Sequence, residues 1–400
     1  MKFSRREFME SAAVTSAAIA SAPSALAQVG KSVPAASAGK TMIVTKYTGI
    51  QSIDGAYELM RRAGDTLDAA IFVLKGQEND PNDNSVGLGG LPNEDGEVEL
   101  DASVMHGPTR RAGAVGAVRR IKNVSLLAKT VMEHTGHVLV VADGASKIAK
   151  VHGFTEENLL TERSRKIWQL WKETMSDQDW WGPGIADPNW KPPTNLTGVP
   201  VAEQRTKRLQ EVAAEIGIEP EWRDYAVAQV VNPPTGTIPC ITLNEKGEMS
   251  AAVSTSGLAW KIQGRLGDSP LIGAGIYLDP EVGGAGVTGN GEENIKIAGS
   301  HTVVEAMRRG LDPKEAAMEA LKRLVSSYKN DMTRLRYINL VFHVLRRDGA
   351  YAGVALWGLT STGKQLQIAV NDGSKRLENV TSMFEGKGLS WPPIPVLPKS

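Results

Sequence analysis

The order of apolar patterns along the chain constrains its fold more than any other feature of the sequence. Paired helical patterns near residues 54–74 precede a strand pattern over 98–105. Farther along, Ile238 to Leu243 leads through an Asn-Glu-Lys-Gly turn into a second alternating run over 248–255, which is typical of a β-hairpin. Another hairpin pattern spans 338–357. Helices grouped between runs of strands predict a layered α/β protein with one sheet packed on another.

Capping residues indicate where several helices begin. Asp65 or Thr66 can cap a helix at residue 66. Asp312, Pro313 and Glu315 supply the cap, the N1 proline and the N3 glutamate of a helix that runs to about residue 328. The remaining patterns predict strands over 42–47 and 137–142, helices over 123–133 and 301–309 and up to Val151, a loop over 82–96, and glycine-rich turns up to Asn294.

Residues 161–225 differ in character from the rest of the chain because tryptophan and proline are concentrated there. We expect an irregular excursion with two helical pieces, near 162–174 and 201–216. Its tryptophans either pack the segment or line a sugar-binding edge. Packing is favoured, since tryptophan is large and is usually buried for packing.

Composition limits the function classes that remain open. The 400 residues suffice for one large domain or two ordinary ones, and 41% apolar with 22% charged residues is normal for a soluble globular protein. The formal net charge is zero, so no overall basic field would attract nucleic acid. The single cysteine, Cys240, excludes an intramolecular disulfide framework and a multi-thiolate zinc site, and it is expected to be a small core residue. The six histidines show no HExxH spacing and receive no catalytic role.

The first 27 residues predict an export signal. Arg5 and Arg6 precede an alanine-rich apolar run over 11–22, and Ala25-Leu26-Ala27 has the form of a cleavage site. The paired arginines are typical of a twin-arginine signal, which predicts a periplasmic or secreted protein that begins at Gln28. The apolar run is too short and too rich in alanine to be a good membrane span, and no stable membrane association is expected.

Three short motifs in the second half contain polar side chains that bear on function. Thr237 opens a strand, Arg265 and Asp268 share a glycine-bounded loop, and Thr288-Gly289 lies in a second glycine-rich loop. Each has an ordinary explanation as a strand threonine, a surface salt bridge or a turn. A phosphate-binding loop is not favoured because the GxxxxGK[ST] pattern is missing.

The order and spacing of these motifs together resemble the glycosylasparaginase family of N-terminal-nucleophile hydrolases. The resemblance covers nearly the whole chain after the signal and is weakest over 161–225. It implies an α/β fold of the α+β type, a four-layer αββα sandwich. Further matching stretches are Ser85-Val-Gly-Leu-Gly-Gly-Leu-Pro-Asn, Leu100-Asp101-Ala, Gly113-Ala-Val-Gly116, Arg119-Arg-Ile-Lys-Asn123, Glu133-His-Thr135 and Ala306-Met-Arg-Arg-Gly310.

The resemblance implies that a single domain over 28–400 cuts itself between Gly236 and Thr237, into chains of 28–236 and 237–400. The chemistry is reasonable, because the cut frees an α-amine on the residue that carries the nucleophilic hydroxyl. An α-amine has a pKa of about 8, against about 10.4 for lysine, so it can accept a proton near neutral pH.

The other site residues are also implied by the resemblance. Thr255 would support the nucleophile. Arg265 would bind the α-carboxylate of the substrate and Asp268 its α-ammonium group, so that a free amino acid is recognised. The Thr288 hydroxyl and the Gly289 amide would hold the oxyanion, and Tyr47 would form an aromatic wall of the pocket.

The sequence departs from the family pattern at three positions. Gly236 replaces the aspartate that assists self-cleavage in the family, although related plant-type asparaginases also have glycine there. Tyr47 stands where the family has a tryptophan beside the substrate pocket. Pro239 replaces a glycine, and because proline cannot donate a ladder hydrogen bond it suggests an edge strand or a strand start.

The resulting hypothesis is a threonine amidohydrolase that cleaves the side-chain amide of glycosylated asparagine and releases aspartate and a glycosylamine. It needs no metal or organic cofactor, acts on a small molecule, and forms a homo-oligomer of cleaved pairs. One alternative is an L-asparaginase or isoaspartyl peptidase with the same chemistry. Another is a binding protein that kept the fold and lost self-cleavage, as Gly236 and Pro239 would permit.

Overall fold

The structure, a computed structural model, describes residues 40–174, 201–234 and 236–389. Its larger sheet has the strand order β12-β11-β1-β5-β6-β2-β3-β4, and its smaller sheet has the order β13-β10-β9-β8-β7. The strands of the larger sheet are β1 (Met42–Lys46), β2 (Glu99–His106), β3 (Arg111–Arg119), β4 (Leu139–Val141), β5 (Gly236–Leu243), β6 (Met249–Gly257), β11 (Gln367–Asn371) and β12 (Lys375–Asn379). Those of the smaller sheet are β7 (Ile276–Asp279), β8 (Gly283–Gly289), β9 (Leu340–Arg346), β10 (Tyr351–Leu359) and β13 (Thr381–Lys387).

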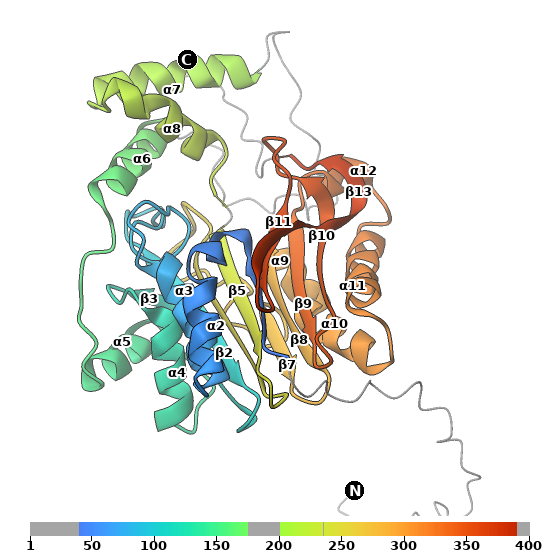
Figure 1. Ribbon diagram of the computed structural model, residues 1–400. Helices are drawn as coiled ribbons and strands as arrows, with labels where there is room; N and C mark the ends of the chain where they lie inside the picture. Colours follow the sequence, from blue (N-terminus) through green and yellow to red (C-terminus); the bar gives the residue numbers. More distant parts are fainter. Residues whose placement is uncertain (1–39, 175–200, 235, 390–400) are drawn as a thin grey trace, which may run out of the picture.

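Helices cover the outer face of each sheet (Figure 1). The larger sheet packs against α2 (Ile53–Arg61), α3 (Thr66–Glu78), α4 (Val124–His134) and α5 (Ala142–Val151), and a short 3-10 helix, η1 (Tyr47–Gln51), follows β1. The smaller sheet packs against α9 (Gly291–Ile297), α10 (Gly299–Arg308), α11 (Pro313–Ser327) and α12 (Met332–Leu335). A third apolar core fills the space between the sheets. The predicted four-layer αββα arrangement is therefore confirmed.

Strand periodicity decides which side chains enter the layer between the sheets. Val44 of β1, Ile241 of β5 and Val253 of β6 contribute to the inter-sheet core. Ile43 and Cys240, which directly precede Val44 and Ile241, instead join the core under the helices. Because side chains alternate across a strand, every second residue of each strand faces the opposite sheet. Antiparallel pairing places the start of β5 beside the ends of β1 and β6. Residues there and at the end of β8 line a common space.

The predicted helix caps and hairpins are confirmed. The Asp65 side chain accepts hydrogen bonds from the N–H groups of Leu67 and Asp68 at the start of α3. The Asp312 side chain accepts one of 2.9 Å from the Glu315 N–H at the start of α11. The predicted hairpins are present as β5–β6 and β9–β10.

Two segments are more regular than predicted. Residues 161–225 were expected to be an irregular excursion with two helical pieces, near 162–174 and 201–216. Both pieces are present, as α6 (Glu162–Glu173) and α7 (Val201–Glu215). The structure adds a third helix, α8 (Pro220–Val231), which has a proline in its first turn. The stretch expected to be glycine-rich turns contains β7, β8 and α9. In β8 the sequence Gly-Gly-Ala-Gly has low strand propensity. The close approach of the other sheet explains why glycine stands in this strand, because a Cβ at Gly286 would lie 2.5 Å from the Cβ of Pro239.

The helices α6, α7 and α8 form a separate apolar cluster above the sheets (Figure 1). Trp171 is buried there and stacks on Trp260 at a centroid distance of 4.9 Å. Trp222 is exposed over 46% of its surface. Packing therefore accounts for Trp171. Three other tryptophans of the segment 161–225 lie outside the described residues, as does the predicted export signal. Within the described ranges, no helix combines the length and the apolar character that a bilayer span requires.

Candidate active site

Thr237 lies near the start of β5, and its side chain faces the layer between the sheets. It shares this face with Ile241, whereas Ile238 and Cys240 face the helices. The side chain of Thr237 is buried, with 7% of the residue exposed. Its hydroxyl donates a hydrogen bond of 3.1 Å to Oγ1 of Thr255.

Thr255 lies on β6 directly opposite Thr237. Its hydroxyl donates a short hydrogen bond to the carbonyl oxygen of Gly236 and accepts one of 2.9 Å from the Gly257 N–H. The Gly236 carbonyl belongs to the peptide bond that joins residues 236 and 237. Thr255 therefore contacts both the candidate nucleophile and the carbonyl beside it.

Gly236 is confined by the loop that contains Ser85. A Cβ at residue 236 would lie 1.6 Å from the Cβ of Ser85 and 2.4 Å from its Cα, and real Cβ atoms do not approach so closely. This contact supplies a steric reason for glycine where the resembled family has aspartate. The Ser85 hydroxyl in turn donates a hydrogen bond of 2.5 Å to Asp83.

Arg265 and Asp268 both border the space in front of Thr237, but they are not paired with each other. The guanidinium of Arg265 donates through Nε and Nη2 to Oε1 of Glu292, at 2.8 and 2.5 Å. Its Nη1 lies against Gly267, where an added Cβ would be 3.0 Å away. The alternative of a surface salt bridge between Arg265 and Asp268 is therefore wrong.

Asp268 is buried, with 5% of the residue exposed. Its Oδ2 accepts a hydrogen bond of 2.8 Å from Nδ2 of Asn294, which is itself fully buried. Burial raises the pKa of Asp268 to about 6, and this effect exceeds the lowering by the Asn294 hydrogen bond and by the charge of Arg265. A cationic group brought into contact with Asp268 would favour the ionised carboxylate.

Thr288 and Gly289 end β8 on the opposite sheet. The side chain of Thr288 faces the inter-sheet layer, as do Gly284 and Gly286 of the same strand, whose α-carbons lie against Ile241 and Pro239. Gly289 has φ of +123°, and a Cβ there would lie 1.9 Å from the carbonyl oxygen of Asn339. Both the backbone conformation and the close contact therefore require glycine.

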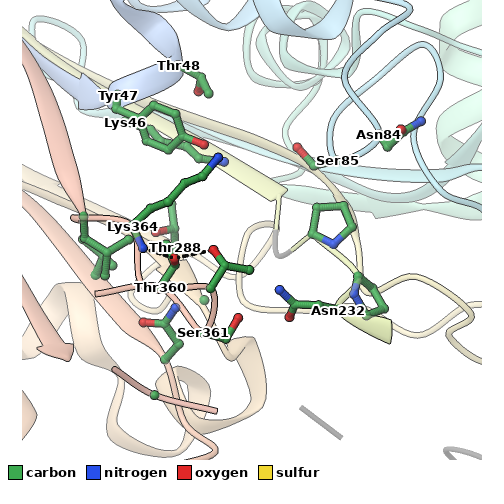
Figure 2. Close-up of a pocket in the computed structure, with 18 of the residues that line it drawn as sticks. Lys46, Tyr47, Thr48, Asn84, Ser85, Asn232, Thr288, Thr360, Ser361 and Lys364 are labelled. Atoms are coloured by element: carbon green, nitrogen blue, oxygen red, sulfur yellow. Dashed lines mark hydrogen bonds between the residues drawn. The ribbon is translucent and has the colours of Figure 1, made fainter. Parts of the chain in front are cut away.

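Two adjoining cavities contain all the predicted site residues. The smaller is lined by Gly236, Thr237, Thr255, Arg265, Asp268 and Gly289, among others. The larger has a volume of about 430 Å³ and is lined by Tyr47 and Thr288. Leu258 and Gly289 line both cavities, which therefore lie next to each other. Figure 2 shows Tyr47, Ser85 and Thr288 around the larger one.

Pro239 was expected on an edge strand or at a strand start, and this expectation is wrong. It lies in the middle of β5, between β1 and β6. The Pro239 carbonyl accepts a 2.6 Å hydrogen bond from Thr45 Oγ1, so its backbone polar groups point toward β1. The ladder between β1 and β5 ends at the pair Thr45–Cys240. The missing N–H therefore breaks no ladder bond.

Several residues of the site were not predicted from the sequence. Glu292 and Asn294 hold Arg265 and Asp268, and Lys46 and Lys364 line the larger cavity. Lys46 precedes Tyr47, and the other three lie in loops or short helices without a distinctive local pattern. Ser85 occurs in a matching stretch but was given no role, because its contact with Gly236 spans 151 positions of the chain.

The chemical groups around Thr237 suit acyl transfer. Within the described part of the chain, no cluster of three or more His, Cys, Asp or Glu side chains is placed to hold a metal ion. Cys240 is fully buried, as predicted, and burial raises the pKa of its thiol. The arrangement instead offers a hydroxyl beside a polarised carbonyl, with one cationic and one anionic side chain around the same cavity.

Comparison with known proteins gives a consistent result. A family model described as "Asparaginase" matches residues 29–334. The N(4)-(Beta-N-acetylglucosaminyl)-L-asparaginase of Elizabethkingia miricola is 33% identical over 357 residues, which cover 89% of this chain and 90% of that protein. The protein of the same name from Rattus norvegicus is 34% identical over 292 residues, or 72% of this chain and 78% of that one. A putative enzyme of this type from Drosophila yakuba is 37% identical over 305 residues, covering 74% and 70% of the two chains.

Proposed function

The chain belongs to the asparaginase family and is a hydrolase that acts on amide bonds, and we propose that it cuts its own backbone before Thr237 and then hydrolyses the side-chain amide of glycosylated asparagine. The names of the relatives from Elizabethkingia miricola and Rattus norvegicus support this substrate. One observation carries the proposal. The hydroxyl of Thr237 lies in a buried site whose opposite partner, Thr255, binds the carbonyl of the peptide bond to be cut.

In the self-cleavage step, Thr237 Oγ1 attacks the carbonyl carbon of Gly236. The bond between this carbon and the Thr237 nitrogen breaks, and the hydroxyl proton ends on the released amine, which gives an ester. Water then hydrolyses the ester and leaves a carboxylate on Gly236 and a free α-amine on Thr237. The hydrogen bond from Thr255 to the carbonyl oxygen stabilises the charge that develops there, which is typically worth about 3 kcal/mol of barrier.

In turnover, the new α-amine of Thr237 acts as the base for its own hydroxyl. The hydroxyl attacks the side-chain amide of the substrate, an aspartyl ester forms, and the amine leaves with the transferred proton. Water then releases aspartate. Arg265 and Asp268 would hold the two charges of the substrate's amino-acid end, and Thr288 with Gly289 would stabilise the oxyanion.

A denaturing gel and an activity assay test this function together. We expect the purified protein to give two fragments, 28–236 and 237–400, and to release aspartate from N-acetylglucosaminyl-asparagine. The Thr237→Ala variant should remain one band and release none, because it lacks the hydroxyl for both steps. An intact and inactive wild-type chain would support the binding-protein alternative instead.

The L-asparaginase or isoaspartyl peptidase alternative shares every catalytic step and differs only in the leaving group. Comparing aspartate release from N-acetylglucosaminyl-asparagine, asparagine and β-aspartyl dipeptides separates these activities. The substrate with the highest kcat/KM identifies the leaving group that the larger cavity accepts.

We also propose that the protein is exported through a twin-arginine signal, which rests on Arg5, Arg6 and the apolar run that follows. Replacing both arginines with lysine should retain the precursor in the cytoplasm of a bacterial host. Cell fractionation would measure this, and normal export of the double variant would contradict it.

A further inference from the structure

The larger cavity borders Thr288 and Gly289 and is also lined by residues of β9, α8 and the loop between β10 and β11. It shares Leu258 and Gly289 with the smaller cavity, but Arg265 and Asp268 line only the smaller one. A substrate whose amino-acid end binds Arg265 and Asp268 would therefore extend its leaving group into the larger cavity. This step rests on the proposed function.

Two lysine side chains enter the larger cavity from different elements. Lys46 is the last residue of β1, and it shares a face with Val44 of the inter-sheet core. Lys364 lies in the loop between β10 and β11. Both residues line the cavity, and Figure 2 shows their side chains extending toward the same region beside Tyr47.

Neither lysine is held in a close ion pair among the described residues. Burial lowers the pKa of Lys46, and the charge of Asp83 opposes this lowering. Lys46 and Lys364 make no ion pair within 4.0 Å there, and the only anionic side chain that lines the cavity is Asp83. The Asp83 carboxylate is already occupied, because it accepts hydrogen bonds from Ser85, from the Val86 N–H and from Gln77. The described lining of the larger cavity therefore contains two cationic side chains and one anionic side chain, and the oxygens of that anionic side chain already accept hydrogen bonds from other residues.

His343 adds no charge to this balance. It lies on β9 with 1% of its surface exposed, and burial together with the nearby Lys46 lowers its pKa to about 3. In the same lining, Gln229 Oε1 and Asn339 Oδ1 are buried and have no hydrogen-bond partner in the part of the chain that the structure describes. Buried polar groups without partners are rare in folded proteins, so these two atoms are available to contact a bound molecule.

We propose that Lys46 and Lys364 form an anion-binding subsite for the leaving group. The preferred substrate accordingly carries a negatively charged substituent on the amine that leaves. The charge is either the carboxylate of an amino-acid leaving group or an acidic group on a sugar, and both present oxygen acceptors to the two ammonium groups.

Two matched substrate pairs test the subsite on the processed protein. One pair is β-aspartyl-alanine and its C-terminal amide, and the other is N-acetylglucosaminyl-asparagine with and without a 6-sulfate. We expect kcat/KM to be about 10-fold higher or more for the charged member of at least one pair, which also identifies the source of the anion. The Lys46→Met and Lys364→Met variants should each lose most of this ratio, while Lys314→Met, at an exposed position in α11, should keep it.

A binding measurement decides the inference independently of catalysis. By titration calorimetry, N-acetylglucosamine 6-sulfate or alanine should bind the wild type more tightly than N-acetylglucosamine or alaninamide. The double variant Lys46→Met/Lys364→Met should lose this difference. Equal kcat/KM within both pairs, or unchanged ratios in the lysine variants, would overturn the subsite. Inactivity toward every substrate, with charge-selective binding intact, would instead overturn only the proposed function.

Discussion

At the scale of single residues, Gly236 and Asp268 are constrained by contacts that leave little choice of side chain. Gly236 is pressed against Ser85, and Asp268 is enclosed with Asn294 as its hydrogen-bond donor. The first contact explains why aspartate does not precede Thr237 in this chain. The second leaves a carboxylate that loses its charge at a higher pH than an exposed aspartate.

The raised pKa of Asp268 predicts an acid limb in the pH profile. Its carboxylate must be ionised to hold the substrate ammonium group, and its pKa in the folded protein is about 6 against an ordinary 3.8. The kcat/KM should therefore fall as the pH drops through about 6. Asp268→Asn should lower kcat/KM at neutral pH roughly 10- to 100-fold and remove this limb. A limb unchanged in the variant would assign it to another group, such as the Thr237 amine.

The contact between Gly236 and Ser85 predicts that even alanine is not tolerated at residue 236. Gly236→Ala should reduce the free energy of unfolding by about 1–3 kcal/mol and slow self-cleavage, because the displaced backbone moves the Gly236 carbonyl away from Thr255. Urea denaturation and a gel time course measure the two effects. Gly136→Ala is the matched control, since no atom lies within 4 Å of a Cβ there. Full processing of Gly236→Ala would contradict the steric explanation.

At the scale of elements, the C-terminal end of α3 connects the site to the helical layer. The fully buried Glu78 accepts hydrogen bonds from Ser254 Oγ on β6 at 2.7 Å and from the N–H and hydroxyl of Ser125 at the start of α4. Ser254 is adjacent to Thr255. One carboxylate therefore holds β6, α3 and α4 together directly behind the candidate catalytic pair.

Removing this connection should destabilise the fold. Glu78→Ala would leave buried donors on Ser125 and Ser254 without an acceptor, so we expect a loss of roughly 3 kcal/mol of unfolding free energy. Chemical denaturation measures it. The control is Glu133→Ala in α4. The Glu133 side chain is 44% exposed, and its removal should change stability by less than about 0.5 kcal/mol. Equal stability of both variants would contradict the role of Glu78.

At the scale of the whole molecule, the proposed cut divides a sheet whose strands are interleaved. In the order β12-β11-β1-β5-β6-β2-β3-β4, β1 precedes the cut but lies between β11 and β5, which follow it. Strands β2, β3 and β4 likewise precede the cut. Of these, β2 pairs with β6, and β3 and β4 continue the sheet beyond β2. The two fragments therefore share one sheet and its cores rather than meeting at a separable interface.

This topology predicts that processing does not release the fragments from each other. The 28–236 and 237–400 chains should co-elute in native gel filtration, at the volume of the uncut Thr237→Ala variant, and should unfold in a single transition. Separation is expected only in denaturant. Elution of either fragment alone under native conditions would show that sheet pairing does not hold the halves together.

Much of the candidate site could be predicted from the sequence because its residues occur in short motifs that follow one another in a characteristic order. Thr237, Arg265, Asp268 and Thr288 were singled out in this way, and the structure brings them around adjoining cavities. Their partners Asn294, Ser85 and the lysines were not predicted. The interactions of these residues are made across the fold, and a single sequence does not display such contacts.

The sequence by itself determined the alternation of strands and helices, the helix caps and the match to a family, since these depend on local periodicity and short-range hydrogen bonds. Only the tertiary structure decided that Pro239 lies in a central strand and that residue 236 must be glycine. It alone also decided that two lysines from different elements share one cavity. These features depend on which strands become neighbours, and that choice is made by burial of the inter-sheet layer over the whole chain.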